Sequence, residues 1–396
     1  MCFAIQTAVD DLNRPDICHL LSRPFALLVN RASIDQRVHR SSDLIHARFP
    51  GFLKWLVTPQ HGMFGQQQAN MVETDHGVDL VNNLPILSLY SETRRLLPQV
   101  LEDIDCLVID LQDVGTRVYT YIWTLMYCLQ DCAKAGKSVV IFDRPNPVTG
   151  LYCEGPLLDP AFRSFVGEAA IPMRHGLTIA EMADFLNRTQ AIGADISVVP
   201  MTGWKRSMWF DDTDRHWIPP SPNMPTIQTA TVYPGQVLLE GTNLSEGRGT
   251  TFPFEVVGAP YVNAEKLAHD MNALALEGVR FLPTYFTPAF DKWRDCSCAG
   301  VSIHVTDRNV FQSYAMTVHL IATCAGLWPS DFRFNDPPYE YETVKPPIDI
   351  ISGSDELRNA ISEGHMELDA VIGHYNCPAA PNWHPVLEEV LIYDVH

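Results

Sequence analysis

The chain has 396 residues, a length that suggests two domains of ordinary size. Hydrophobic residues make up 46% of it and charged residues 19%, as in globular proteins that bury a large core. Its 47 acidic residues outnumber 28 basic ones, which gives a net charge of −19, and Lys and Arg form no cluster. This balance argues against nucleic acids and anionic membranes as partners, because both attract clustered cations.

The amino-terminal segment and the cysteines bear on the compartment. Residues 1–11 have no basic residue before their apolar stretch and turn acidic at Asp10, unlike a secretory signal. No apolar run approaches the roughly 20 residues of a membrane helix. Cysteines in apolar runs, such as Cys106 and Cys128, are typical of a reducing environment. We therefore expect a cytoplasmic protein, or a periplasmic or secreted one if a signal precedes this sequence.

The first half of the chain alternates strands with helices. The expected strands are 25–29, 55–57, 85–90, 107–109 and 139–142. The expected helices are 35–49, 93–101 and 122–135, the last with Gly136 as its C-cap. This alternation predicts a Rossmann-like, parallel α/β sheet. No Gly-x-Gly-x-x-Gly follows the first strand, so dinucleotide binding is not expected.

From residue 151 onward the pattern becomes less regular. A helix is expected over 177–187, where Thr178 and Glu181 form a capping-box pattern, and a strand over 196–200. The loop 217–225 is too proline-rich for helix or central strand and can hold Ser221 and Asn223 rigidly.

The sequence predicts a first, catalytic domain over residues 1–228 and a smaller α/β (α+β) domain over 229–396. In the second domain we expect helices over 264–276 and 311–326, a strand over 301–305, two short helices ending at 375, and a docked tail formed by 382–385 and 388–393. The glycine-rich segment 240–251 is expected to reach the cleft, because glycine lets backbone approach a ligand closely.

Three apolar runs end directly in dense polar motifs. These motifs are Thr58-Pro-Gln-His-Gly62, Asp110-Leu-Gln-Asp-Val-Gly-Thr-Arg-Val-Tyr-Thr-Tyr121 and Asp143-Arg-Pro-Asn-Pro147. The carboxyl ends of parallel strands lie at one edge of a sheet, where open α/β sheets bind ligands. The sequence therefore predicts one site for a polar, hydroxyl-rich substrate. The alternative is that each Asp and Asn caps the turn or helix that follows it.

These motifs carry a resemblance to a known family. Together with Pro220-Ser-Pro-Asn-Met-Pro-Thr226 and Glu240-Gly-Thr-Asn-Leu-Ser-Glu-Gly-Arg-Gly-Thr250, they stand in the order seen in the NamZ-type exo-β-N-acetylmuramidases. The resemblance extends from about Pro24 to the C-terminus. It implies a glycosidase that removes terminal, non-reducing N-acetylmuramic acid from peptidoglycan fragments, such as a muropeptide or a disaccharide with N-acetylglucosamine. It implies neither a metal nor another cofactor.

The chain departs from the family pattern at one position. Many family members read Pro-Glu-His-Gly where this chain has Gln60 before His61. Glutamine neither donates nor accepts a proton in catalysis, so another carboxylate must act if activity is kept. Glu73 is the nearest candidate along the sequence.

Glycoside cleavage usually divides its work between two carboxyl groups whose environments push their pKa values apart. The candidate carboxylates are Glu73, Asp110, Asp113, Asp143, Glu240 and Glu246. We expect the catalytic residues to be Glu73, Asp113, His61 and Glu246. The substrate's own acetamido oxygen offers a second route that needs one independent proton donor.

The remaining polar residues of the motifs are candidates for substrate binding. They are Gln60, Asp110, Gln112, Arg117, Tyr119, Tyr121, Asp143, Arg144, Asn146, Ser221, Asn223 and Arg248. One of the three arginines is expected to pair with the lactyl carboxylate of N-acetylmuramic acid. Tyr119 and Tyr121 share one side if their segment is extended.

Two other functions remain open from the sequence. His61 with Asp110, Asp113 and Asp143 resembles a metal-ligand set, as in a metal-dependent hydrolase. Alternatively, Gln60 marks a catalytically weakened muropeptide-binding protein.

Overall fold

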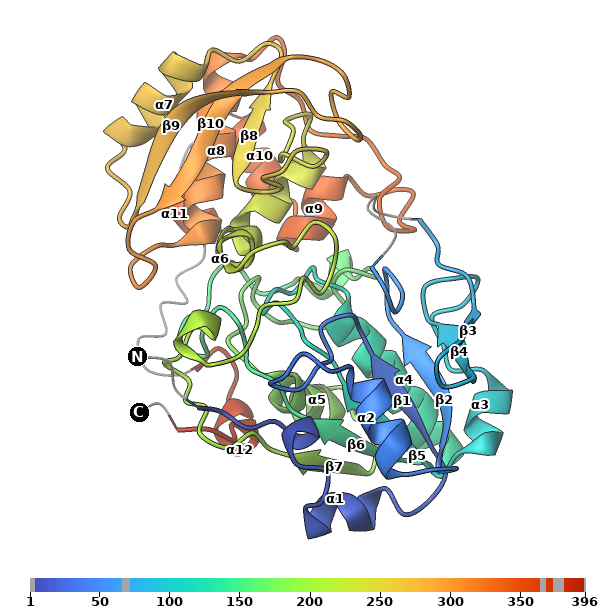
Figure 1. Cartoon of the computed structure of the whole chain (residues 1–396). Coiled ribbons are helices and arrows are strands. Elements are labelled where there is room, and N and C mark those ends of the chain that lie inside the picture. Colours follow the sequence, from blue (N-terminus) through green and yellow to red (C-terminus); the bar gives the residue numbers. More distant parts are fainter. Residues whose placement is uncertain (1–3, 66–71, 364–367, 373–380, 395–396) are drawn as a thin grey trace.

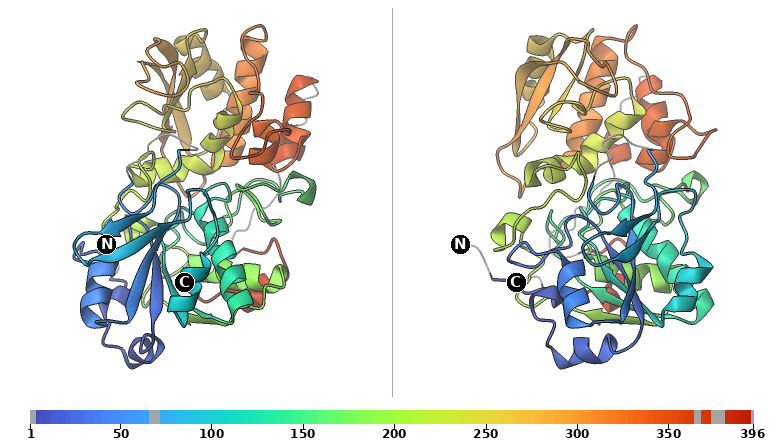
Figure 2. Two further views of the ribbon diagram at one scale, coloured as in Figure 1. Left: turned by 90° about the vertical axis from the view of Figure 1, so that its right-hand side faces the viewer. Right: turned by 45° about the vertical axis from the view of Figure 1, so that its right-hand side comes forward.

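The structure is a computed structural model that describes residues 4–65, 72–363, 368–372 and 381–394. Its two domains lie one above the other (Figure 1). The first domain contains a seven-stranded sheet and the second a three-stranded sheet. Figure 2 shows from two further sides that the second domain, coloured yellow to orange, covers one end of the first.

The sheet of the first domain has the strand order β3-β4-β2-β1-β5-β6-β7. Its strands are β1 (Phe25–Val29), β2 (Leu53–Thr58), β3 (Gly77–Asp79), β4 (Leu84–Ser88), β5 (Cys106–Asp110), β6 (Ser138–Phe142) and β7 (Ile196–Val199). Every neighbouring pair is parallel except β3 with β4. The predicted Rossmann-like parallel sheet is confirmed.

Helices cover both faces of this sheet. They are α1 (Pro15–Leu20), α2 (Ser41–Arg48), α3 (Pro98–Asp103), α4 (Tyr121–Ala135) and α5 (Ile179–Thr189). In β5, Leu107 and Ile109 belong to the core under α4, whereas Cys106 and Val108 belong to the core under α1 and α2. Because both faces are buried, the strands consist of continuous apolar residues and not of alternating ones.

Local signals at two helix ends were predictive, but the helices expected from residues 35 and 93 begin later, the second of them at Pro98. Thr178 and Glu181 form the expected capping box on α5, and Gly136 ends α4 in the left-handed conformation. The helix expected from residue 35 begins only at Ser41. The Asp35 side chain accepts hydrogen bonds from the backbone of Arg37 and His39, and such local bonding favours a turn over a helix.

The second domain packs helices against the antiparallel sheet β8-β10-β9. Its elements are α6 (Ile227–Gln236), η4 (Val237–Gly241), β8 (Val256–Ala259), α7 (Ala264–Ala273), β9 (Val279–Phe286), β10 (Cys298–Val305), α8 (Ser313–Leu327), α9 (Pro347–Ser352), α10 (Glu356–Ser362) and α11 (Leu368–Ile372). The sequence did not reveal β9, which contains Pro283. Proline is tolerated there because β9 lies at the edge of its sheet.

The end of the chain leaves the second domain and returns to the first. The short helix α12 (Leu387–Val390) packs against α5 (Figure 1). The Tyr393 hydroxyl donates a hydrogen bond to Asp143 over 2.6 Å, and the Trp383 indole donates one to the His175 carbonyl. The expected docked tail is thus present, but the end of the predicted second short helix, Tyr375, lies outside the described residues. The domain division at residue 228 stays a prediction.

Among the helices that the structure describes, none is both long and apolar enough to cross a membrane.

Candidate active site

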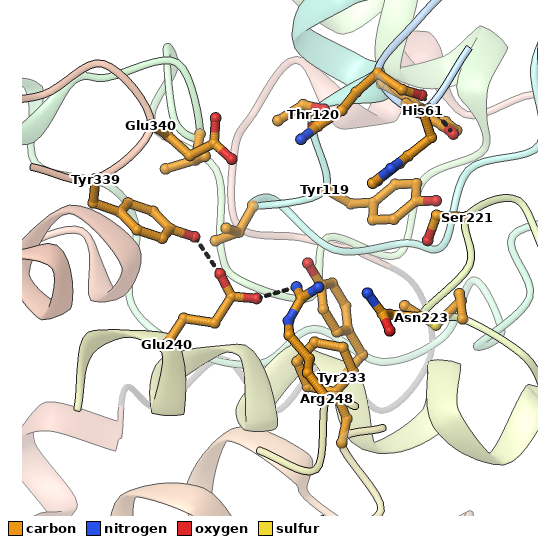
Figure 3. A pocket seen from close by; sticks show the side chains of 16 residues that line it. His61, Tyr119, Thr120, Ser221, Asn223, Tyr233, Glu240, Arg248, Tyr339 and Glu340 are labelled. Carbon is orange, nitrogen blue, oxygen red and sulfur yellow. Dashed lines mark hydrogen bonds and ion pairs between the residues drawn. The ribbon is translucent and has the colours of Figure 1, made fainter. Parts of the chain in front are cut away.

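A pocket lies between the carboxyl edge of the first-domain sheet and the second domain (Figure 3). It is lined by Gln60, His61, Val118, Tyr119, Thr120, Tyr121, Val166, Ser221, Asn223, Met224, Tyr233, Glu240, Arg248, Phe254, Tyr339 and Glu340. About 480 Å³ of space free of protein atoms lies among these side chains, including the part that opens to solvent. All of them are at most 9% exposed. The chain therefore encloses a polar pocket at the edge where open α/β sheets bind ligands.

The segment after β2 supplies Gln60 and His61. The Thr120 hydroxyl donates a hydrogen bond of 2.7 Å to the Gln60 side-chain carbonyl. His61 has a φ of 71°, and Gly62 follows with a φ of 65°. A Cβ atom on Gly62 would lie 2.7 Å from the Thr74 methyl group, so glycine is needed where the chain turns away from the strand.

Tyr119 and Tyr121 both line the pocket, but not through an extended segment. The chain turns at residues 116–119, and α4 begins at Tyr121. The two rings meet edge to face with centroids 4.6 Å apart. The Tyr121 hydroxyl donates to the Pro220 carbonyl over 2.8 Å and so anchors the proline-rich loop that carries Ser221 and Asn223. Both residues of that loop line the pocket, as expected from the sequence.

Glu240 and Arg248 lie on the second-domain wall of the pocket and belong to a network of ion pairs that continues behind this wall. The Arg248 guanidinium contacts Glu240 at 2.6 Å and Glu246 at 3.2 Å, and the Lys292 ammonium contacts the other oxygen of Glu246 at 2.8 Å. Burial acts to raise the pKa of Glu246, but Lys292 and Arg248 outweigh it and hold that pKa below its usual range. Glu246 therefore supports Arg248 from behind, and it does not line the pocket.

The glycines of the loop 240–251 do not serve the purpose expected of them. Gly249 has a φ of 78°, and a Cβ atom there would lie 2.6 Å from the Phe290 carbonyl oxygen. The close approach is thus between two parts of the protein and not between backbone and ligand. The loop nonetheless carries Arg248 to the pocket.

Glu340 enters the pocket from the second domain, next to Tyr339 in the sequence (Figure 3). The Tyr90 hydroxyl donates a hydrogen bond of 2.8 Å to its carboxyl group, and Gln60 provides a second one. Burial raises the pKa of Glu340 to about 7, although both hydrogen bonds act to lower it.

Several residues predicted to bind substrate are instead buried among backbone groups. Arg144 forms a two-pronged pair with Asp110, with one contact at 2.8 Å, and also donates to the Ile34 carbonyl. Asp143 accepts from the Ala180 amide and the Tyr393 hydroxyl, and burial raises the pKa of Asp143 to about 7. Their polar groups hold loops at the sheet edge and these residues do not line the pocket, so their contact with substrate stays a prediction that this geometry does not favour.

Gln112, Asn146 and Arg117 likewise do not line the pocket and bond backbone groups. The Gln112 amide donates to the carbonyls of Asp113 and Pro145, and Asn146 donates to the Leu177 carbonyl. Arg117 is 0% exposed and donates to four backbone carbonyls. The sequence shows that these side chains follow strands, but it does not show that they cap the loops around them.

Asp113 and Glu73 also lie outside this pocket. Asp113 accepts a 2.7 Å hydrogen bond from the Gly115 amide and has His175 at 3.7 Å. The Glu73 side chain is 52% exposed and its nearest ion-pair partner, Arg94, is 3.7 Å away. A carboxyl group so exposed is not enclosed with a substrate, so the geometry does not favour Glu73 as the replacement for a glutamate at position 60.

Four polar residues that line the pocket, besides Glu240, were not selected from the sequence as catalytic or substrate-binding. They are Thr120, Tyr233, Tyr339 and Glu340. Tyr233 lies in α6 and Glu340 follows a proline pair, and neither position carries a local pattern that marks a site. Glu240 was a candidate carboxylate, and it lines the pocket.

The proposed metal-ligand set is not assembled in the structure. Within residues 4–65, 72–363, 368–372 and 381–394, no three His, Cys, Asp or Glu side chains are grouped so that they could hold a metal ion. Asp110 and Asp143, two of the four suggested ligands, are engaged as described above.

Both domains resemble proteins that are already described. Residues 25–228 match the family "Exo-beta-N-acetylmuramidase NamZ, N-terminal" and residues 231–393 match its C-terminal counterpart. The peptidoglycan beta-N-acetylmuramidase NamZ of Bacillus subtilis (strain 168) is 41% identical over 371 residues, which are 94% of this chain and 87% of that protein.

Two solved structures have the same fold. A DUF1343 family protein from Bacteroides fragilis NCTC 9343 is 31% identical, with a TM-score of 0.87 over 98% of this chain and 99% of that one. A second protein of that family from the same organism is 24% identical, with a TM-score of 0.75 over 99% of both chains. The chain thus belongs to the NamZ family of exo-β-N-acetylmuramidases.

Proposed function

We propose that this chain is a glycoside hydrolase that removes terminal, non-reducing N-acetylmuramic acid from peptidoglycan fragments. The observation that carries the proposal is the match to a relative named for β-N-acetylmuramidase activity, which extends over 94% of the chain and so includes both walls of the pocket. The substrate is a muropeptide or a saccharide in which N-acetylmuramic acid is linked to N-acetylglucosamine.

The pocket has the chemistry that an amino sugar requires. Tyr119, Tyr121 and Tyr233 offer ring faces and edges, and Glu240 and Glu340 offer two carboxyl groups. Because every lining residue is nearly buried, the pocket suits the end of a saccharide better than its middle. This enclosure supports removal of a terminal sugar.

Arg248 is the arginine that we assign to the lactyl carboxylate. Of the three arginines predicted for this role, Arg248 lines the pocket. The Arg117 guanidinium instead donates to backbone carbonyls, and that of Arg144 pairs with Asp110. A guanidinium group matches a carboxylate with two parallel hydrogen bonds. This pairing provides selectivity over N-acetylglucosamine, which lacks the lactyl group.

A hydrolysis assay tests the proposed function. A chromogenic N-acetylmuramide and the matching N-acetylglucosaminide are incubated with the protein, each with and without a chelator. We expect chelator-resistant release from the muramide and much slower release from the glucosaminide. Turnover that stops with chelator indicates a metal-dependent hydrolase. Calorimetric binding of the muramide without turnover indicates the muropeptide-binding protein that Gln60 suggests.

A further inference from the structure

The turn at residues 339–342 carries two side chains into the pocket. Its ends are joined by two backbone hydrogen bonds of 2.9 Å between Tyr339 and Glu342. At its tip, Glu340 and Tyr341 have φ values of 42° and 70°. Turns with two positive φ values usually hold Asn and Gly, because other side chains are strained there. Strain of this kind is found most often at functional sites, so the turn is a candidate for more than a structural role.

Contacts on both sides hold the strained turn in place. The Tyr341 ring lies 4.1 Å from the Arg94 guanidinium, which also lies 4.8 Å from the Tyr90 ring. On the other side, the Tyr339 hydroxyl donates a 2.7 Å hydrogen bond to Glu240. The position of Glu340 is thereby fixed against residues of both domains.

Neutral groups hydrogen-bond the Glu340 carboxyl. The Tyr90 hydroxyl donates at 2.8 Å, and Gln60 is the other hydrogen-bond partner. The Gln60 carbonyl oxygen already accepts from Thr120, which leaves its NH₂ group to face Glu340. Glu340 is 4% exposed, and burial raises its pKa to about 7. A protonated form is therefore well populated near neutral pH.

Glu240 lies in the same pocket in the opposite environment. One of its oxygens is 2.6 Å from the Arg248 guanidinium, and the other accepts the Tyr339 hydrogen bond. An arginine cation therefore faces Glu240, whereas neutral hydrogen-bond donors face Glu340. Glycosidases use one carboxyl group as the proton donor and a second one as a negative charge near the reacting carbon. Glu340, which is buried among neutral donors, suits the first role. Glu240, which is paired with arginine, suits the second.

We propose that Glu340 is the proton donor of the glycosidase, while Glu240, held by Arg248 and Tyr339, faces the positive charge that develops at the anomeric carbon. This assignment rests on the proposed glycosidase function. Gln60 supports Glu340 through its NH₂ group and transfers no proton.

The reaction cleaves one glycosidic bond and consumes one water molecule. The Glu340 proton passes to the glycosidic oxygen while the bond from that oxygen to the anomeric carbon breaks, and the bonding electron pair leaves with the oxygen. Water then adds to the anomeric carbon, and the proton that it loses returns to Glu340. Between these events, Tyr90 and Gln60 donate hydrogen bonds to the Glu340 carboxylate.

Glu340→Gln tests the assignment through its dependence on the leaving group. On a disaccharide of N-acetylmuramic acid and N-acetylglucosamine we expect kcat/KM to fall about 10²–10⁴-fold, the usual contribution of a general acid. On the dinitrophenyl N-acetylmuramide we expect kcat/KM near wild type, because that leaving group departs without a proton and kcat/KM reports the steps up to its departure. In the wild type the disaccharide rate should fall above about pH 7, where Glu340 loses its proton, and this limb should be absent in the variant.

Two further variants keep the test decisive if the turn is disturbed. Glu342→Gln changes the next acid of the same turn, which bonds the backbone of Val344, and should keep wild-type rates on both substrates. Glu340→Asp keeps an acid and should fall between wild type and Glu340→Gln on the disaccharide. Equal losses on both substrates, or none, in a variant with a wild-type melting temperature would overturn the assignment. A wild type that hydrolyses neither substrate overturns the glycosidase function itself, which separates the two failures.

Gln60→Glu provides an independent test at the facing position. A second carboxyl beside Glu340 removes a hydrogen-bond donor and adds a like charge, and both changes raise the pKa of Glu340. We therefore expect the alkaline limb to move to higher pH with no rise in maximal kcat. A gain of about 10²-fold or more in kcat would show that position 60 is the natural place of the proton donor and would overturn the assignment to Glu340.

Discussion

Replacing Arg248 with Met is expected to cost roughly 2–4 kcal/mol of transition-state binding for an N-acetylmuramide, the usual cost of truncating a buried charge pair. This corresponds to a loss of about 30- to 900-fold in kcat/KM. Both substrates should lose the part of the rate that depends on Arg248 holding Glu240, but only the N-acetylmuramide also loses the pairing with its lactyl carboxylate, so the matching N-acetylglucosaminide should lose less. The ratio of the two kcat/KM values is the measurement.

Lys292→Met is the matched control for Arg248→Met. Lys292 belongs to the same network of ion pairs, since its ammonium group contacts Glu246 at 2.8 Å, but it does not line the pocket. Its loss should disturb Glu246 and lower stability while the preference for the muramide is kept. If Arg248→Met keeps the wild-type preference, the arginine is structural and the lactyl carboxylate binds elsewhere.

Replacing Arg117 with Met is expected to destabilise the fold by about 3–5 kcal/mol, because four buried carbonyls lose their donor and each buried acceptor left unsatisfied costs roughly 1–3 kcal/mol, less where the loops relax. The guanidinium donates to the carbonyls of Pro156 and Ile171 in the first domain and of Ile351 and Ser352 in the second, at 2.8–3.0 Å. Burial lowers the pKa of Arg117 to about 10, so it stays charged at neutral pH. Methionine would leave all four carbonyls without this donor.

The free energy of unfolding in urea measures this loss. Arg188→Met is the control, because Arg188 is 43% exposed and its pairs with Asp184 and Glu389 are surface pairs, each worth less than about 1 kcal/mol. The folded Arg117→Met protein should keep the wild-type sugar preference. A variant of normal stability that loses the preference for the muramide would instead make Arg117 a substrate contact.

The amino-acid sequence alone determined the class of fold and the family. Apolar runs of five or so residues, such as Phe25–Val29 and Cys106–Asp110, form strands because a parallel sheet covered on both faces needs continuous apolar strands. The capping box of Thr178 with Glu181 begins α5 through hydrogen bonds between neighbours in sequence. Signals of this kind are local, so they can be recognised without the structure.

Only the tertiary structure decided which polar residues face a substrate. Arg117 and Arg248 each lie in a polar motif that contains glycine, so their sequence contexts are alike. Arg117 nonetheless bonds a carbonyl 234 residues away, whereas Arg248 lines the pocket. Glu340 meets Tyr90 across 250 residues. A buried polar group must find a partner, and that partner is set by which loops pack together at the domain interface. The residue types were therefore visible from the sequence, whereas their partners, and with them their roles, depended on long-range packing.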